Sequence, residues 1–243
     1  YKVDMKVIGK EGVIQVDEII TVEFSEPRRG IFRKIPYIYK VDGNELEIKI
    51  SDANVEDYHY TTYTEGSDYV IKIGDKNVFI DGVQTYHISY SVKKAFLLLE
   101  DHTEFYWNIL GNGWPVDVQK LRYKVTLDET LPMTTNDYRI YTGIKGDTAQ
   151  AATVNYYMGK FEGETTKPFG PHEGLTLAIN LPKEYVKRPS DTEMFWEKYG
   201  KAGIGGFLFL IFSILDVQVK AAEAVIVDVR KNLQMSKAEK VYR

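Results

Sequence analysis

The chain has 243 residues, with 31 Lys and Arg against 35 Asp and Glu, and a formal net charge of -4. This balance gives no electrostatic footprint for nucleic acid, and the lack of cysteine excludes disulfides, thiolate catalysis and cysteine-based zinc sites. A chain of this length allows one large domain or two small ones, and its 18 tyrosines suit half-buried strand positions.

Alternating apolar and polar residues predict a mainly β fold from the start of the chain. In residues 13–24 one parity is apolar except at Glu18, as in a half-buried antiparallel strand; it consists of Ile14, Val16, Ile20, Val22 and Phe24. The glycine-flanked residues 9–12 predict a hairpin turn, and residues 95–99 could be a strand or one helical turn. Further strands are predicted at residues 3–8, 45–51, 58–64, 69–73, 85–92, 104–109, 121–127, 138–141, 153–158 and 175–181.

Short strands with frequent turns and no long helical pattern are typical of an antiparallel β-sandwich, here in one or two modules. We expect an N-terminal β-sandwich module at residues 1–117. Residues 118–183 are expected to form a second β module or to continue the sandwich. Residues 184–202 are more polar and predict a linker with a short helix.

The C-terminal part changes character. Residues 203–219 are apolar and could form a membrane-proximal or transmembrane helix. Their uncharged part, residues 203–215, would cover only about 20 Å as a helix, whereas a bilayer core needs roughly 20 apolar residues. A buried core helix is the alternative, and we favour the membrane.

Residues 220–243 predict an amphipathic helix, because apolar side chains repeat every four residues. This stripe could pack on its own protein, on a membrane protein partner or on another copy of the chain. An excess of Lys and Arg after residue 216 modestly favours a cytoplasmic C-terminal side. The stripe consists of Val217, Ala221, Val225, Val229 and Leu233.

The sequence contains no motif that indicates a cofactor, a metal or a catalytic set. The scattered histidines form no metal-binding spacing, and no serine lies in a nucleophile elbow. In the run Asp101-His102-Thr103-Glu104 acid and base are adjacent in sequence, but neighbouring side chains on a turn diverge, so a solvated turn is favoured. The histidines are His59, His87, His102 and His172.

Two stretches combine aromatic side chains with basic or amide groups. In residues 30–36, apolar residues alternate around Arg33, which could bind a ligand or form a buried structural pair with Glu18. In residues 105–115, Trp107, Asn108 and Trp114 surround a glycine-rich turn. Exposed aromatic rings beside amides would suit a sugar ring or a peptide, although a core tryptophan with a corner turn is the favoured interpretation.

At these stretches the chain resembles the extracytoplasmic region of bacterial predicted membrane proteins, the domain of unknown function 2207 family. The resemblance covers about residues 1–183 and implies a signal peptide ahead of residue 1, an outward β region, and then membrane helices. It supplies no reaction. The matching pieces, in family order, include Gly30-Ile31-x-Arg33-x-Ile35-Pro36, Tyr86-x-Ile88-x-Tyr90, Tyr106-Trp107-Asn108-x-x-Gly111-x-x-Trp114 and Glu173-Gly174-Leu175-Thr176.

We therefore expect a membrane-anchored extracytoplasmic β domain that binds a protein partner or an envelope component. It would lie in the cell membrane, with residues 1–183 outside. The alternatives are a hydrolase of cell-wall polymer, with Asp101 and Glu104 as its carboxylates, and a purely structural subunit of an envelope assembly. A binding role is favoured over an enzyme because no catalytic set is apparent.

Overall fold

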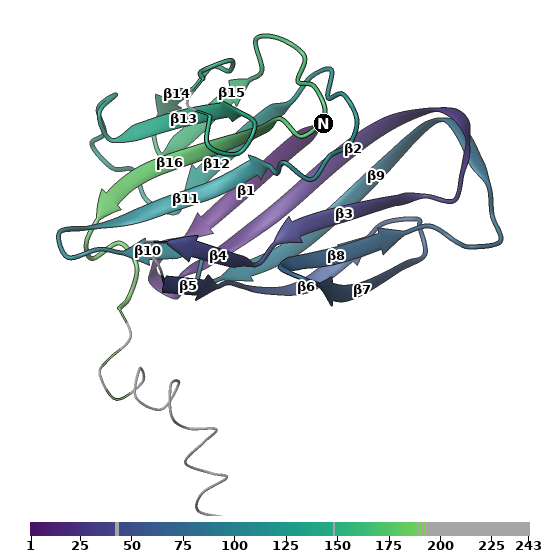
Figure 1. Cartoon of the computed structure of the whole chain (residues 1–243). Coiled ribbons are helices and arrows are strands. Elements are labelled where there is room, and N and C mark those ends of the chain that lie inside the picture. Colours follow the sequence, from purple (N-terminus) through teal and green to yellow (C-terminus); the bar gives the residue numbers. More distant parts are fainter. Residues whose placement is uncertain (42–43, 148, 189, 191, 193–243) are drawn as a thin grey trace, which may run out of the picture. The chain divides into compact units, whose positions relative to one another are not determined.

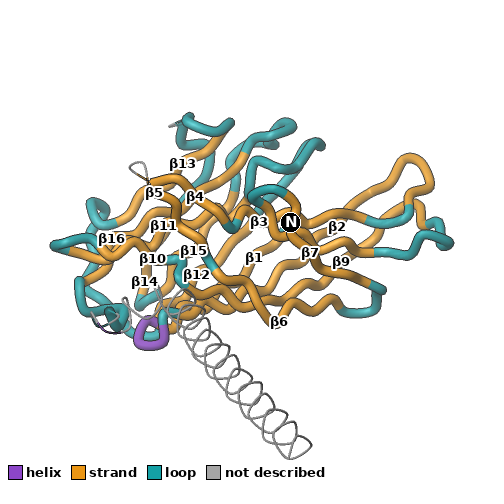
Figure 2. Tube along the Cα trace, turned by 60° about the horizontal axis from the view of Figure 1, so that its bottom comes forward, coloured by secondary structure: helices purple, strands orange, loops and turns teal. Residues whose placement is uncertain are grey.

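The computed structural model describes residues 1–41, 44–147, 149–188, 190 and 192. Residues 1–188 form one compact unit, which is mainly β, as the sequence predicted. Figure 2 shows strands along most of this unit, joined by loops at their ends. None of the described residues forms a helix long and apolar enough to cross a membrane. The helices expected at residues 203–219 and 220–243 lie outside the described residues, as does the apolar stripe from Val217 to Leu233.

The largest sheet has seven strands in the order β14-β15-β12-β1-β2-β9-β6 (Figure 1). β1 and β2 form a hairpin because the 3-10 turn Gly9–Glu11 ends at Gly12, whose φ of 61° suits glycine and whose N–H donates to the Gly9 carbonyl. On its other side β1 pairs in parallel with β12. The strands are β1 (Lys2–Ile8), β2 (Val13–Arg28), β6 (Lys49–Val55), β9 (Ile80–Lys93), β12 (Arg122–Leu127), β14 (Asn155–Tyr157) and β15 (Lys160–Glu164).

Three smaller sheets complete the unit. A four-stranded sheet has the order β10-β11-β16-β13, a three-stranded sheet the order β3-β8-β7, and β4 pairs with β5. Both larger sheets combine strands from before and after residue 118, since β12 lies beside β1 and β16 beside β11. These strands are β3 (Ile31–Pro36), β4 (Ile38–Val41), β5 (Asn44–Glu47), β7 (Tyr60–Glu65), β8 (Asp68–Ile73), β10 (Phe96–Leu98), β11 (His102–Leu110), β13 (Tyr138–Gly143) and β16 (Gly174–Pro182).

The three larger sheets share one hydrophobic core. Period-two alternation turns one face of each strand inward, and these inward faces meet in a single cluster. Each fully buried aliphatic or aromatic side chain contributes about 1.5–3 kcal/mol to stability. The cluster includes Val16 and Tyr86 from the seven-stranded sheet, Trp107 and Leu177 from the four-stranded sheet, and Ile35 and Ile71 from the three-stranded sheet.

Most predicted strands are present, with ends that shift by a few residues. The ambiguous residues 95–99 contain strand β10. The strand predicted at residues 45–51 is divided at the buried Ile48 into β5 and β6. β3, β4 and β15 were not predicted as strands. In β3 a charged residue, Arg33, occupies an inward position where an apolar residue would be expected. β15 has only one large apolar side chain, Phe161, so it shows no apolar alternation.

Candidate functional site

Glu18 on β2 and Arg33 on β3 meet in the interior of the domain. The Nε and Nη2 groups of Arg33 donate to the two carboxylate oxygens of Glu18, each at 2.7 Å. The side chains are only 3% and 1% exposed for Arg33 and Glu18 respectively. The hydroxyl of Tyr90 on β9 donates to the same carboxylate at 2.7 Å, and Nη1 of Arg33 donates to the carbonyl of Lys34. Every nitrogen of the guanidinium is therefore bonded within the protein.

The electrostatics of this cluster keep the pair charged. Burial alone would raise the pKa of Glu18, but the charge of Arg33 and the hydrogen bonds from Arg33 and Tyr90 hold that pKa below its ordinary value. Burial and the Glu18 carboxylate raise the pKa of Tyr90 well above its ordinary value. The hydroxyl of Tyr1 is buried beside the pair without a well-aligned hydrogen bond, and burial raises its pKa as well. This closed geometry suits a structural pair better than contact with a ligand.

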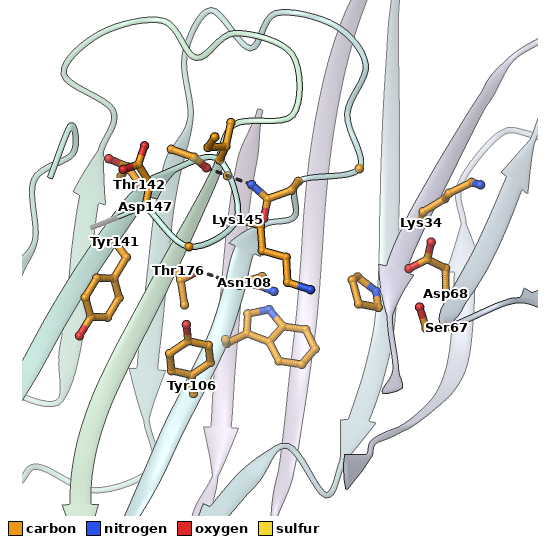
Figure 3. Close-up of a pocket in the computed structure, with 18 of the residues that line it drawn as sticks. Lys34, Ser67, Asp68, Tyr106, Asn108, Tyr141, Thr142, Lys145, Asp147 and Thr176 are labelled. Carbon is orange, nitrogen blue, oxygen red and sulfur yellow. Dashed lines mark hydrogen bonds between the residues drawn. The ribbon is translucent and has the colours of Figure 1, made fainter. Parts of the chain in front are cut away.

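A groove of about 1000 Å³ opens between the four-stranded sheet and β3 (Figure 3). One wall consists of side chains on the outer face of the four-stranded sheet, and the other of side chains on β3 and at the start of β8. The loop that follows β13 carries two charged residues to the groove. The first wall includes Glu104, Tyr106, Asn108, Tyr141 and Thr176, the second includes Lys34, Pro36, Ser67 and Asp68, and the loop contributes Lys145 and Asp147.

Strand alternation explains the first wall. Even-numbered residues of β11 face outward and odd-numbered residues face the core, so Tyr106 is 42% exposed while Trp107 is 3% exposed. Thr176 on β16 lies opposite Asn108 in the register, and its hydroxyl donates to the Asn108 side-chain oxygen at 2.6 Å. Burial and the neighbouring Tyr141 raise the pKa of Tyr106.

Glu104 differs from the other groove residues because its carboxyl group is partly buried and no hydrogen bond from a described residue offsets the cost of that burial. It lies on the same face of β11 as Tyr106, and burial raises its pKa above the ordinary value, opposed only by His102. Among the described residues no hydrogen bond to its carboxylate is formed. A half-buried acceptor of this kind is available to a donor from a ligand.

The groove is largely preformed, because the loop after β13 is held from both sides. The Asn112 side-chain amide donates to the carbonyls of Gly143 and His172, at 3.0 and 2.8 Å. Gly143 has a φ of 118°, and a Cβ there would lie 2.6 Å from a carboxylate oxygen of Asp147. A side chain at this position would therefore displace Asp147 from the groove.

The structure places the sequence-predicted residues in three locations. Trp107 and Asn108 line the groove, although Trp107 is only 3% exposed. Trp114 lies apart from the groove and packs edge-on against Tyr1, with ring centroids 6.0 Å apart. Arg33 lies in the interior, paired with Glu18.

The two carboxylates considered for a hydrolase do not share the groove. Glu104 lines it, whereas Asp101 is 84% exposed on the turn before β11 and contacts Nδ1 of His102 at 2.7 Å. The part of the chain that the structure describes contains no cluster of three or more His, Asp or Glu side chains that could hold a metal ion.

Several groove residues were not identified from the sequence. Tyr141, Thr176, Lys145 and Asp147 come from strands and a loop that only the sheet order brings beside β11. Alternation within each strand could have shown which side chains face outward. It could not have shown which strands are neighbours.

The fold and the groove thus belong to a β domain with a preformed surface site, and comparison with known proteins gives its family. Residues 1–181 match the family model described as the N-terminal domain of a predicted membrane protein (DUF2207). The chain belongs to this family, which confirms the resemblance seen in its motifs.

The chain is similar to the uncharacterized protein YciQ of Escherichia coli strain K12, with 28% identity over 204 residues. The match covers 76% of this chain and 30% of YciQ, so the chain spans less than a third of that relative. Among solved structures, it is similar to the M1 zinc metallopeptidase of Deinococcus radiodurans and to a mutant of that enzyme, with 10% identity and TM-scores of 0.37 and 0.36. Each of these two structural matches covers 72% of this chain and 40% of the matched enzyme chain. TM-scores this low carry no argument about fold or activity.

Proposed function

We propose that this chain is the outward-facing, ligand-binding β domain of a protein anchored in the cell membrane. Residues 1–183 would lie on the extracytoplasmic side, and the groove would bind a protein partner or an envelope component. Membership of a predicted membrane protein family supports the membrane anchoring. The strand pairing supports one continuous β unit, in which residues 118–183 continue the module begun by residues 1–117 through the parallel pair β1–β12 and the antiparallel pair β11–β16.

The observation that carries the binding role is the composition of the groove wall on the four-stranded sheet. Tyr106 and Tyr141 offer rigid aromatic surface, and Asn108, Thr176 and Glu104 offer polar groups on the same face. Ligand sites in general combine such surfaces with a few polar groups that fix orientation. A hydrolase is less well supported, because Asp101 does not face the groove.

The absence of cysteine from this chain makes the outward location directly testable. A cysteine at the 74% exposed Tyr157 (Tyr157→Cys) should react with a membrane-impermeant maleimide in intact cells that produce the complete membrane protein. The unsubstituted protein gives the background labelling, and the buried Val125→Cys variant should not exceed that background. Labelling of Tyr157→Cys only after permeabilisation would place the domain on the inner side and refute the proposal.

The same chemistry tests whether the groove is occupied in the envelope. Ser67→Cys puts a thiol of similar size on the groove wall, and Tyr157→Cys puts one far along the chain on an exposed strand end. If a ligand fills the groove, Ser67→Cys should react more slowly in native membranes than in the purified protein. Equal reactivity of Ser67→Cys in both settings, with unchanged Tyr157→Cys, would contradict a groove-bound ligand.

A further inference from the structure

Strand β7 forms an open edge of the three-stranded sheet, at the lower margin of the domain in Figure 1. β8 pairs with one side of β7 along its whole length, from Tyr60 to Glu65. On the other side, no strand among the described residues pairs with it. Every residue of β7 after Tyr60 is exposed. β7 is therefore an accessible sheet edge in the part of the chain that the structure describes.

The register identifies the backbone groups on this edge. The N–H of Gly74 donates to the carbonyl of His59 at 2.8 Å, and these two residues lie opposite each other one step before Tyr60 in the β7–β8 register. Odd-numbered residues of β7 therefore direct their backbone groups toward β8, and even-numbered residues direct theirs outward. The outward row consists of the N–H and C=O groups of Tyr60, Thr62 and Thr64, and no described residue forms a backbone hydrogen bond to them.

The other sheet edges that the structure describes are protected in ways that β7 lacks. Native edge strands avoid unwanted pairing by being short, bulged, covered, or marked by lysine or proline. β10 and β14 have three residues each, and β4 and β5 have four. β6 is bulged at Asp52, whose φ is 56°, the N–H of Thr142 on β13 donates to the Ala149 carbonyl, and β3 carries Lys34 and ends at Pro36. β7 has six residues and no bulge, lysine or proline.

The sequence of β7 is complementary to itself. In an antiparallel pair with a twofold axis at Thr62, Thr62 lies opposite its own counterpart and Tyr60 lies opposite Thr64, so the whole outward row is hydrogen-bonded. No residue from Tyr60 to Thr64 is charged, so no like charges oppose each other. On the other face Tyr63 lies opposite Thr61, and pairs of an aromatic and a β-branched side chain stabilise sheets.

The ends of the strand select this register. With the axis at Thr62, Glu65 lies opposite His59 of the second copy, and both side chains are on the same face because both are odd-numbered. Both are exposed. Lys34 bonds one oxygen of the Glu65 carboxylate, which leaves the other to accept from the His59 ring. Moving the axis one residue toward the N-terminus would instead set Glu65 against Asp57, an unfavourable pair of like charges.

We propose that β7 is a self-association site, at which two copies of this chain pair edge to edge along residues 60–65 and join their three-stranded sheets into one continuous sheet. Each copy covers the open edge of the other, so the pair is closed and does not extend into a fibre. The pairing of Glu65 with His59 and the uncharged row between them fit a second copy of this chain. This self-association is separate from ligand binding in the groove, so either can be absent without the other.

Disulfide cross-linking tests the register directly, because the chain has no cysteine of its own. In the proposed pair Thr62→Cys lies opposite itself, with the two Cα atoms about 5.5 Å apart, within the range that a disulfide spans. Thr64→Cys is the matched control, since it is exposed on the same face but lies roughly 14 Å along the strand from its counterpart. Mild oxidation of the purified complete chain should give a covalent dimer for Thr62→Cys and only background dimer for Thr64→Cys.

Equal cross-linking of the two variants would indicate random collision, and no cross-linking of Thr62→Cys would mean that the pair does not form. Either result overturns the inference. The same variants can be oxidised in cells that produce the complete membrane protein, where Thr62→Cys should again join two copies. Cross-linking there to a different protein would assign the edge to that protein, and this outcome also overturns self-association.

A charge at the axis provides a test that needs no cross-link. Thr62→Lys sets two like charges opposite each other, while the exposed side chain leaves the pairing with β8 intact. Sedimentation over a range of concentrations should show a dimer for the unsubstituted chain and dimerisation at least about tenfold weaker for Thr62→Lys. Tyr157→Lys adds the same charge at another exposed site and should not change dimerisation. Thermal unfolding checks that both variants are folded. An unsubstituted chain that stays monomeric, or equal dimerisation of folded Thr62→Lys, refutes the pairing.

Discussion

The buried Glu18–Arg33 cluster and the groove show two opposite uses of polar side chains on β-strands. In the cluster, each charged group finds its partners within the protein, and the side chains are hidden from solvent. In the groove, the half-buried carboxylate of Glu104 faces an open space, and no described residue donates a hydrogen bond to it. The comparison teaches that the charged groups that hold this fold together are bonded to each other, whereas the half-buried Glu104 carboxylate stays open to a donor from another molecule.

The largest effect is expected from breaking the buried pair. Arg33→Ala leaves the Glu18 carboxylate buried and unpaired, which should lower the free energy of unfolding by about 3–5 kcal/mol. Urea denaturation followed by tryptophan fluorescence would measure it. Replacing both residues by apolar ones (Glu18→Leu with Arg33→Met) should recover much of the loss. A stable Arg33→Ala protein that fails to bind ligand would instead assign Arg33 to recognition.

Tyr90 and Tyr86 offer a matched pair of deletions on the same strand. The hydroxyl of Tyr90 donates to a charged carboxylate, so Tyr90→Phe should cost about 1.5–3 kcal/mol. The hydroxyl of Tyr86 is buried and has no hydrogen-bond partner among the residues that the structure describes, so Tyr86→Phe should be neutral or stabilising. Equal losses in the two variants, measured by thermal unfolding, would show that the cluster hydrogen bond is not what stabilises the domain.

Acid should weaken the cluster in a defined direction. The pKa of Glu18 in the folded protein lies below the ordinary value of 4.5. The carboxylate therefore contributes stability that is present above that value and is lost as pH falls through the folded pKa. At pH values below about 4.5, the thermal unfolding midpoint of the wild type should fall with decreasing pH more steeply than that of Glu18→Gln. Parallel curves for the two proteins would contradict this account.

The smallest effect on stability is expected at the groove. Tyr106→Ala alters an exposed side chain and should change the free energy of unfolding by no more than about 0.5 kcal/mol. It should nevertheless weaken ligand binding, so the Ser67→Cys thiol should react faster in native membranes when Tyr106 is also replaced by Ala. As a control, Lys34→Ala removes an exposed ion pair and should leave stability unchanged within error. A large loss of stability in Tyr106→Ala would make this wall part of the core.

Sequence reasoning reached most of the strands because each depends on its own stretch of residues. Glu18 stood out because it interrupts the apolar parity of residues 13–24, and pairing with Arg33 was one of two alternatives considered for that arginine. The groove could not be predicted in this way. Its wall requires β13, β16 and β11 to be neighbours, and the position of Thr176 opposite Asn108 follows from their register. β3 was missed as a strand because Arg33 occupies a core position in it.

The position of β1 has a consequence for the order of folding. β1 lies between β2, the next strand in the sequence, and the distant strand β12. Lys2 therefore pairs with both Ile19 and Arg122. The parallel pairing closes a loop that spans nearly half of the chain, and the entropic cost of closing a loop grows with its length. High contact order of this kind is associated with slow folding. A growing chain can form the β1–β2 hairpin early, yet one edge of β1 stays open to aggregation until β12 has been synthesised. The domain is therefore expected to complete its main sheet late, and a fragment that ends before Arg122 should not be stable alone.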